Sequence, residues 1–322
     1  MKTEQTTKVA CLYAVLALLT QTLSQAQSWT NKASLPQQAL PSGTRAIGIA
    51  ALGGKFYTVG GLDWPNAIST LLQYDPARDT WTRKADMLSA RYAPAAAAIR
   101  GRLYALGGLS NQTAVATVEC YNPVSNTWTN KAQMQNARWA FQAVALAGKI
   151  YAMGGLGGGN SNPTDVPYLE QYDPLRDTWT QKAAMPTPRN SFGAAAVNGK
   201  IYVIGGYDYN GNHRYIAEVY EYNPRLDSWT IKGAMSTSRE TLGVVAVGGR
   251  ILTLGGSSPG LARATIEQYI PRLDAWTTKA DMPQARNECF ALVSRNTLYA
   301  FGGYDDWTMD GLLRLSRFLV KQ

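Results

Sequence analysis

The chain is poor in the residues that build metal centres, disulfide frameworks and nucleic-acid-binding arms. Its single histidine, His213, excludes any site that needs several imidazole ligands. Only Cys120 and Cys289 follow residue 26, too few for a disulfide-dense scaffold. Charged residues are 16% of the chain, and despite a net charge of +9 its lysines and arginines form no continuous block. We therefore expect no metal, no cofactor and no nucleic-acid partner.

Long apolar runs are also scarce, and the one present lies near the amino terminus. It extends from Val9 to Leu19, follows Lys2 and Lys8, and precedes a polar stretch that ends in small residues at Ala26. A membrane-spanning helix needs about 17–25 apolar residues. The layout is that of a secretory signal peptide. We expect residues 1–26 to be that peptide, residues 27–322 to form one domain without a transmembrane segment, and the protein to be secreted, extracellular or periplasmic.

A glycine pair after a short apolar strand recurs six times. The steps between successive pairs are 47, 47, 51, 50 and 47 residues. Each pair follows a run that alternates large and small apolar side chains, such as "KIYVIGG" at 200–206, which is typical of a buried strand. The pairs are Gly60-Gly61, Gly107-Gly108, Gly154-Gly155, Gly205-Gly206, Gly255-Gly256 and Gly302-Gly303.

Two further signals follow each of the first five glycine pairs in a fixed order. A strand that ends in Tyr-Asp-Pro or Tyr-Asn-Pro comes first, and the fifth copy departs from it as Tyr269-Ile270-Pro271. A strand that contains Trp-Thr comes next. The strand that ends at the glycine pair forms a hairpin with the strand before it, so each repeat has four short antiparallel strands. The repeated tryptophans are Trp29, Trp81, Trp128, Trp179, Trp229 and Trp276.

The order and period of these elements resemble those of kelch-repeat β-propellers, over essentially all of residues 27–322. The resemblance implies an all-β fold of six blades. The sixth repeat has a third strand near Leu312–Arg317 and no tryptophan strand after it, which would leave an open sheet edge. Trp29 closes no repeat before it, so we expect the amino-terminal strand around Trp29 to complete blade six and close the ring.

The glycine pairs and the repeated tryptophans are expected to be structural. Glycine permits backbone torsions and close approaches that a Cβ atom forbids. A tryptophan ring between neighbouring blades buries a large apolar area. These residues specify the ring and not its ligand.

An arginine opens the innermost strand of every repeat, and two interpretations of it stay open. In the first, each guanidinium hydrogen-bonds to loop carbonyls or to a carboxylate of the next blade, because an identical residue in every repeat usually serves the repeat. In the second, the six ring the mouth of the central channel and bind an anionic ligand through their forked donors. The resemblance supports the second, since kelch domains that bind acidic peptides use arginines at this position. They are Arg45, Arg91, Arg138, Arg189, Arg239 and Arg286.

Aromatic residues outside the repeat pattern are the other candidates for ligand contact. They are expected on the same face, which carries the longer and more variable loops. Aromatic rings among amide, acidic and arginine side chains suit a carbohydrate or a peptide. The alternative is that each ring packs on its own loop. The candidates are Tyr92, Trp139, Trp64, Tyr207 and Trp307.

We expect an exported binding module for a protein, peptide or glycan ligand rather than an enzyme. Copper-radical oxidases of the kelch class need two histidines, which this chain lacks. The enzyme alternative is a sugar mutarotase or epimerase similar to the sialic-acid mutarotases, with Glu240 and Glu288 as the catalytic acid and base. A purely structural cell-surface protein is the second alternative. The oligomeric state does not follow from the sequence.

Overall fold

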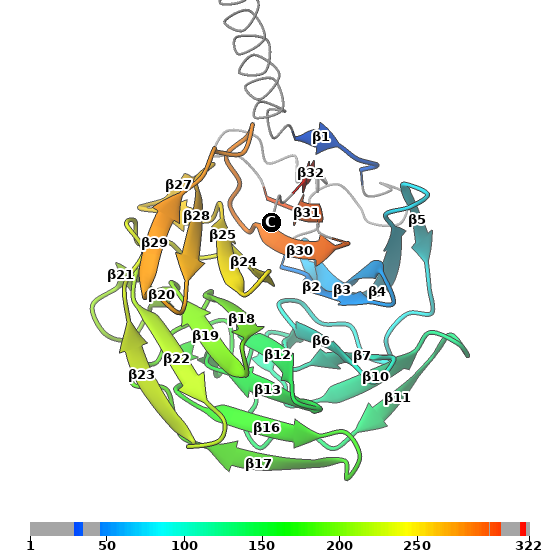
Figure 1. The fold of residues 1–322 in the computed structure, drawn as a ribbon. Coiled ribbons are helices and arrows are strands. Elements are labelled where there is room, and N and C mark those ends of the chain that lie inside the picture. Colours follow the sequence, from blue (N-terminus) through cyan, green and yellow to red (C-terminus); the bar gives the residue numbers. More distant parts are fainter. Residues whose placement is uncertain (1–28, 35–45, 296, 304–315, 320–322) are drawn as a thin grey trace, which may run out of the picture.

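The computed structural model describes residues 29–34, 46–295, 297–303 and 316–319. Throughout these residues the regular elements are β-strands. Six four-stranded antiparallel sheets surround a central channel, and each sheet runs from an innermost strand beside the channel to an outermost strand at the perimeter (Figure 1). The expected six-bladed propeller is confirmed. The expected signal peptide at residues 1–26 lies outside the described residues.

Five blades are built from consecutive segments. Blade one comprises β2 (Gly48–Leu52), β3 (Lys55–Asp63), β4 (Asn66–Asp75) and β5 (Thr80–Arg83). Blade two comprises β6 (Ala95–Ile99), β7 (Arg102–Leu106), β10 (Val118–Asn122) and β11 (Thr127–Lys131). Blade three comprises β12 (Gln142–Leu146), β13 (Lys149–Met153), β16 (Leu169–Asp173) and β17 (Thr178–Lys182).

The next two blades repeat this order. Blade four comprises β18 (Gly193–Val197), β19 (Lys200–Ile204), β22 (Val219–Asn223) and β23 (Ser228–Lys232). Blade five comprises β24 (Gly243–Val247), β25 (Arg250–Leu254), β28 (Ile266–Ile270) and β29 (Ala275–Thr278). Four small hairpins follow the glycine pairs of blades two to five: β8 (Leu109–Ser110) with β9 (Thr113–Ala114), β14 (Leu156–Gly157) with β15 (Thr164–Asp165), β20 (Tyr207–Asp208) with β21 (Arg214–Tyr215), and β26 (Ser257–Ser258) with β27 (Leu261–Ala262).

Blade six joins the two ends of the chain. Its strands are β30 (Phe290–Ser294), β31 (Thr297–Phe301), β32 (Ser316–Leu319) and β1 (Thr30–Asn31), with Thr30 opposite Arg317. Strand β32 lies later in the chain than the expected Leu312–Arg317. Trp29 packs half-buried against the blade five and six core that contains Leu252. The amino-terminal strand thus closes the ring as predicted, and the edge of β32 is covered.

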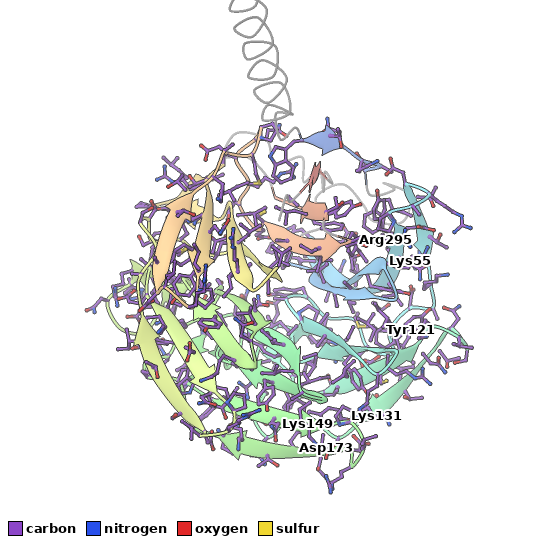
Figure 2. All side chains as sticks on the ribbon, viewed as in Figure 1. Lys55, Tyr121, Lys131, Lys149, Asp173 and Arg295 are labelled. Atoms are coloured by element: carbon purple, nitrogen blue, oxygen red, sulfur yellow. The ribbon has the colours of Figure 1, made fainter. Side chains whose placement is uncertain are left out.

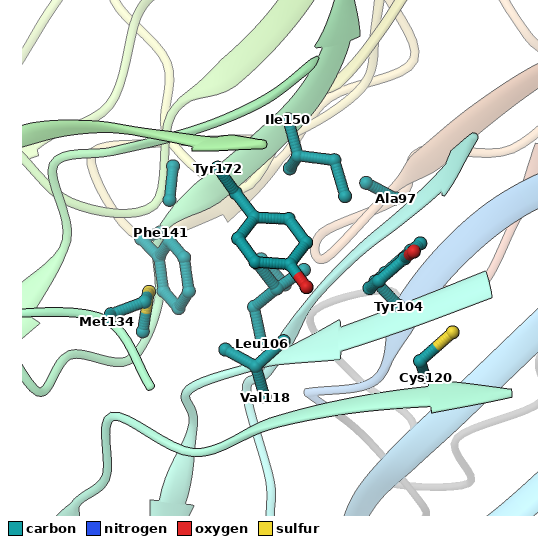
Figure 3. Packing of buried hydrophobic residues seen from close by; sticks show 11 residues of the cluster. Ala97, Tyr104, Leu106, Val118, Cys120, Met134, Phe141, Ile150 and Tyr172 are labelled. Carbon is teal, nitrogen blue, oxygen red and sulfur yellow. The ribbon is translucent and has the colours of Figure 1, made fainter. Parts of the chain in front are cut away.

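Apolar side chains from facing sheets fill the space between neighbouring blades. Between blades two and three, Leu106 and Val118 meet Phe141 and Tyr172 in one buried cluster (Figure 3). Similar clusters lie at the other interfaces of the ring. Each sheet therefore buries both faces, which accounts for runs of apolar residues in the second strands.

The repeated tryptophans fasten each outermost strand to the preceding blade. The Trp128 indole N–H donates to the carbonyl of Ala85 at 2.8 Å, and that of Trp179 donates to Ala132 at 2.8 Å. Trp128 is buried and the other described rings are half-buried. These residues lie between blades, where the ring buries a large apolar area and the indole N–H donates a hydrogen bond.

The glycine pairs adopt left-handed torsions because the next blade approaches them closely. Gly154 has φ of +60°, and a Cβ atom there would lie 2.7 Å from both the Met185 Cε atom and the Phe192 ring. The amide of Gly155 donates to the carbonyl of Arg189 in the following blade at 2.9 Å. The pair therefore holds the start of the neighbouring innermost strand in place.

Candidate functional site

The central channel of the propeller forms a cavity with a volume of about 490 Å³. The innermost strands of all six blades line it, mostly with small apolar side chains such as Ala97, Ala145 and Ala196. We call the end where these strands begin the channel mouth. It is the end that faces the variable hairpins, because the strands of each blade alternate in direction.

A ring of hydrogen bonds joins the blades at the channel mouth. Five of them are backbone bonds, each from an amide to the carbonyl of the preceding blade, at 2.6–3.2 Å. The sixth, between blades six and one, differs: the Ala46 amide donates to the carboxylate Oε2 of Glu288 at 3.0 Å. The five backbone bonds run from Ala93 to Ala46, Ala140 to Ala93, Ser191 to Ala140, Thr241 to Ser191 and Cys289 to Thr241. Glu288, a predicted catalytic residue, thus serves ring closure.

The expectation that the arginines line the channel mouth is wrong for the five that the structure describes. Arg91, Arg138, Arg189, Arg239 and Arg286 are 0–5% exposed and lie inside their own blades. Arg138 Nη1 donates to the carbonyl of Tyr168 at 2.8 Å, and Arg286 Nη1 to that of Gly302 at 2.6 Å. Arg45 lies outside the described residues. Because these donors are used internally, the candidate site is built from other residues.

Three of these arginines form buried ion pairs with a glutamate of the third strand. Arg91 faces Glu119 at 3.1 Å, Arg138 pairs with Glu170, and Arg239 pairs with Glu267 at 2.5 Å. Burial lowers the pKa of Arg138 and the Glu170 charge opposes this shift. The sequence contained a signal for this, because a glutamate in the middle of a strand buried on both faces needs a cationic partner.

Blade four uses an aromatic ring in place of the glutamate. Tyr220 occupies the equivalent position, and the Arg189 guanidinium lies 4.2 Å from its ring centroid. Arg189 Nη1 also donates to the carbonyls of Gly205 and Glu218, both at 3.1 Å. Cation–π contact and carbonyl acceptors thus replace an ion pair.

Two of the predicted aromatic residues lie together at the channel mouth. Tyr92 and Trp139, from blades two and three, pack edge to face with centroids 6.2 Å apart, and both contribute to the channel wall. Tyr92 is buried and Trp139 is half-buried. The Trp139 indole Nε1 is buried without a hydrogen-bond partner in the part of the chain that the structure describes. An unused indole donor beside a channel is available to a ligand.

The remaining aromatic candidates are dispersed. Trp64 is 72% exposed at the tip of the β3–β4 hairpin. Tyr207 is half-buried and packs edge to face on Tyr215, with centroids 5.3 Å apart. Trp307 lies outside the described residues. The structure therefore does not bring Trp64 and Tyr207 into one aromatic cluster with Tyr92 and Trp139.

Glu240, at the start of blade five, is a partly buried carboxylate whose side chain has no hydrogen bond or ion pair with the described residues. Burial, with the Glu288 charge as the second cause, raises the pKa of Glu240 to about 7. Glu240 in turn adds to the raised pKa of Tyr207, which burial mainly causes. A carboxyl group that is desolvated, unpaired and close to a second carboxylate is a mark of a functional site.

Two polar residues, Thr241 and Asn287, complete this sector of the mouth. The Thr241 hydroxyl donates to the Asn287 side-chain oxygen at 2.5 Å, and the same oxygen accepts the Glu288 amide at 2.8 Å. Thr241 lines the channel. Their only sequence signal was their position one or two residues after the repeated arginine.

The unpaired state of Glu240 predicts a pH-dependent stability that Glu240→Gln removes. The folded protein keeps the Glu240 proton up to about pH 7, whereas the unfolded chain releases it near 4.5. The folded state binds more protons between these values, so this contribution to stability is present below pH 4.5 and is lost as pH rises through 7. Glutamine does not ionise. The free energy of unfolding of Glu240→Gln minus that of the native protein should therefore rise by on the order of 2 kcal/mol between pH 4.5 and pH 8.

Urea unfolding of both proteins across that range measures this effect. The control is Glu218→Gln, because Glu218 pairs with Arg214 at 2.8 Å on the surface and its pKa is lowered. Parallel stability curves for the native protein and Glu240→Gln would contradict the prediction.

Other classes of site find no support in the described part of the chain. No group of three or more potential metal ligands occurs there. Cys120 and Cys289 are free thiols, both buried. None of the described elements is a helix that could span a bilayer.

The fold and the repeat identify the class as a kelch-repeat β-propeller. The chain belongs to the Attractin/LZTR1 beta-propeller family, whose match covers residues 56–313. The solved structure of YjhT superimposes with a TM-score of 0.74 at 17% identity, over 88% of this chain and 96% of that one. At this identity the likeness establishes the fold alone.

Kelch-like proteins match shorter segments. Kelch-like protein 1 of Mus musculus is 44% identical over 41 residues, which are 13% of this chain and 6% of that protein. Kelch-like protein 13 of Homo sapiens is 44% identical over 52 residues, or 16% and 8%. Kelch-like ECH-associated protein 1A of Danio rerio is 38% identical over 60 residues, or 18% and 10%. The matches thus span a tenth or less of these relatives' length.

Proposed function

We propose that this protein is an exported interaction module that binds a carbohydrate or peptide ligand at the channel mouth. The family supports an interaction role in general, and the unpaired carboxylate of Glu240 supports this position in particular. A buried polar group without a partner costs free energy, and a ligand donor would recover it. The signal peptide expected from the sequence supports export.

The chemistry of the mouth favours a ligand rich in hydrogen-bond donors. In its ionised form Glu240 accepts hydrogen bonds only and attracts hydroxyl or ammonium groups. Tyr92 and Trp139 offer an apolar surface beside the channel. Sugar hydroxyls with an apolar ring face, or a peptide amine with an apolar side chain, combine these properties. The buried arginines give no support to a specifically anionic ligand.

A binding screen tests this proposal. The mature chain, residues 27–322, is applied to glycan and peptide arrays together with Glu240→Gln and Trp139→Ala. We expect a hit that weakens at least tenfold in Glu240→Gln, because loss of a charge-assisted hydrogen bond costs about 1.5–3 kcal/mol. Trp64→Ala, a change to an exposed ring that does not line the channel, is the control. A hit that persists unchanged in both mouth variants places the site elsewhere.

A sugar mutarotase or epimerase is the second candidate function, and one observation favours it. A carboxyl group with a pKa near 7 exchanges a proton readily at neutral pH, which anomer interconversion requires of its acid and base. Glu240 would supply this group, while Glu288 is held by the Ala46 amide. Anomer exchange of reducing sugars, followed by NMR with and without protein, measures it. Loss of exchange in Glu240→Gln with binding retained would favour the enzyme.

A further inference from the structure

We propose that a basic crescent on the face opposite the channel mouth binds anionic lipid bilayers. The crescent consists of Arg100, Arg102, Arg250 and Arg295. These arginines lie at or beside the turns between first and second strands: Arg100 and Arg295 within the turns, Arg102 and Arg250 directly after them. This site is independent of the function proposed for the mouth.

The topology places the four arginines along one arc. First strands run away from the channel mouth, so all first-to-second turns surround its other end. The arginines belong to blades five, six and two, with blade one between six and two. Figure 1 shows the inner strands β24, β30, β2 and β6 following one another around the channel, and they are in contact in this order. The crescent thus covers four consecutive blades.

The equivalent lysines of blades one, three and four are held in ion pairs, and the crescent arginines form none with the described residues. In blades one and three the partner aspartate is shared with Arg78 or Arg176. In blade one Lys55 pairs with Asp75, and in blade four Lys200 lies 3.3 Å from Glu221. In blade three Lys149 pairs with Asp173 at 2.5 Å, and Figure 2 shows the two side by side.

Blades two and five lack the acid that would do this. Blade two has Cys120 and Asn122 at the two acidic positions of the third strand, and blade five has Gln268 and Ile270. None of the four arginines forms an ion pair with the described residues.

The crescent is open to solvent, on a face whose connecting turns are short. Arg100, Arg250 and Arg295 are exposed and Arg102 is half-buried. The connecting turns have only two residues, and around the turn glycines Gly53 and Gly248 there is open space. In the described part of the chain no hairpin rises on this side, in contrast to the mouth, where β8–β9, β14–β15, β20–β21 and β26–β27 follow the glycine pairs.

Exposed aliphatic side chains add to this face and favour a bilayer over a soluble polyanion. The turns between third and fourth strands open toward the same side, since strand direction alternates. In blades two and five they carry Val124 and Leu273, which are 90% and 60% exposed. Arginines beside aliphatic groups suit the interface of an anionic membrane, where the charges meet phosphates and the aliphatic chains meet the acyl boundary.

The test compares two triple variants that lose the same charge from the same face. One is Arg100→Gln, Arg250→Gln and Arg295→Gln, and the other is Lys55→Gln, Lys149→Gln and Lys200→Gln. Sedimentation with vesicles of phosphatidylcholine, with and without phosphatidylglycerol, measures the partition coefficient. We expect binding that depends on phosphatidylglycerol and falls about fivefold for each arginine removed, which corresponds to about 1 kcal/mol per charge near the surface.

The controls separate the crescent from net charge and from folding. The lysine variant should lose less binding than the arginine variant, because its ammonium groups are held by carboxylates and are less free to contact lipid phosphates. Glu240→Gln should bind vesicles as the native protein does, which separates this site from the mouth. Far-ultraviolet circular dichroism checks that each variant is folded. Equal loss in both triple variants, no binding to phosphatidylglycerol vesicles, or binding only to a soluble polyanion such as polygalacturonate would each overturn the proposal.

Discussion

Replacing Glu170 by alanine should lower the free energy of unfolding by about 3–5 kcal/mol, because the change leaves the buried Arg138 charge without its counterion. Glu170 also accepts the backbone amides of Gln135 at 2.7 Å and Asn136 at 3.2 Å, so these donors lose their acceptor as well. Both charged side chains are fully buried. Urea or guanidinium unfolding of the purified variant measures the loss.

A glutamate on the surface of the next blade is the matched control. Glu221 pairs with Lys200 at 3.3 Å while both side chains are partly exposed to water. Glu221 also accepts the hydroxyl of Tyr202 at 2.5 Å, so Glu221→Ala should cost about 1–2 kcal/mol, for an exposed ion pair and one hydrogen bond. Equal denaturant midpoints for Glu170→Ala and Glu221→Ala would contradict the prediction that the buried pair stabilises the protein more than the surface pair does.

Removal of residues 27–34 should destabilise the protein by at least about 3 kcal/mol and cause it to associate. The deletion takes away β1 and the half-buried Trp29 ring, where truncation of a fully buried tryptophan costs about 3–5 kcal/mol. It also removes Ala33, whose amide donates to Asp79 and whose carbonyl accepts the Trp81 indole N–H, both at 2.9 Å. The uncovered edge of β32 is then free to pair with another molecule.

Thermal unfolding and light scattering measure the two parts of this expectation. The reference protein starts at residue 27, so that both chains lack the expected signal peptide. A synthetic peptide of residues 27–34, added in excess, should restore part of the stability and suppress association, because it can pair with β32 in the place of β1. A truncated chain that stays monodisperse and equally stable would show that ring closure contributes little.

The glycine pairs, the tryptophans and the period together predicted the ring, because each reports a backbone constraint that repeats with the blade. Ring closure by the strand around Trp29 was predicted because that strand has no repeat before it and the sixth repeat has no tryptophan strand after it. The arginines were misplaced because a repeat at the start of an inner strand fixes the backbone position and not the side-chain direction. Arg138 turns into its blade toward Glu170, a residue about 30 positions later that the repeat alone does not connect with it.

The isolation of Glu240 could not be predicted either. It depends on what surrounds the carboxylate in space, and the residues that do so come from several blades, including Tyr207 and Glu288. The basic crescent depends on a similar absence, since blade five has Ile270 where blade three has Asp173. Such a difference between repeats can be interpreted only when the structure shows that the lysines of the other blades pair with these acids.

The hydrogen-bond ring at the channel mouth has one bond unlike the other five, and this bears on stoichiometry. A ring of six equal sectors would offer a ligand six overlapping positions. Among the described residues that line the channel, Glu288 is the one carboxylate, and it marks the junction of blades six and one with Glu240 in the neighbouring blade. A ligand that is selected by those groups has one orientation, and titration calorimetry should count a single molecule bound per propeller.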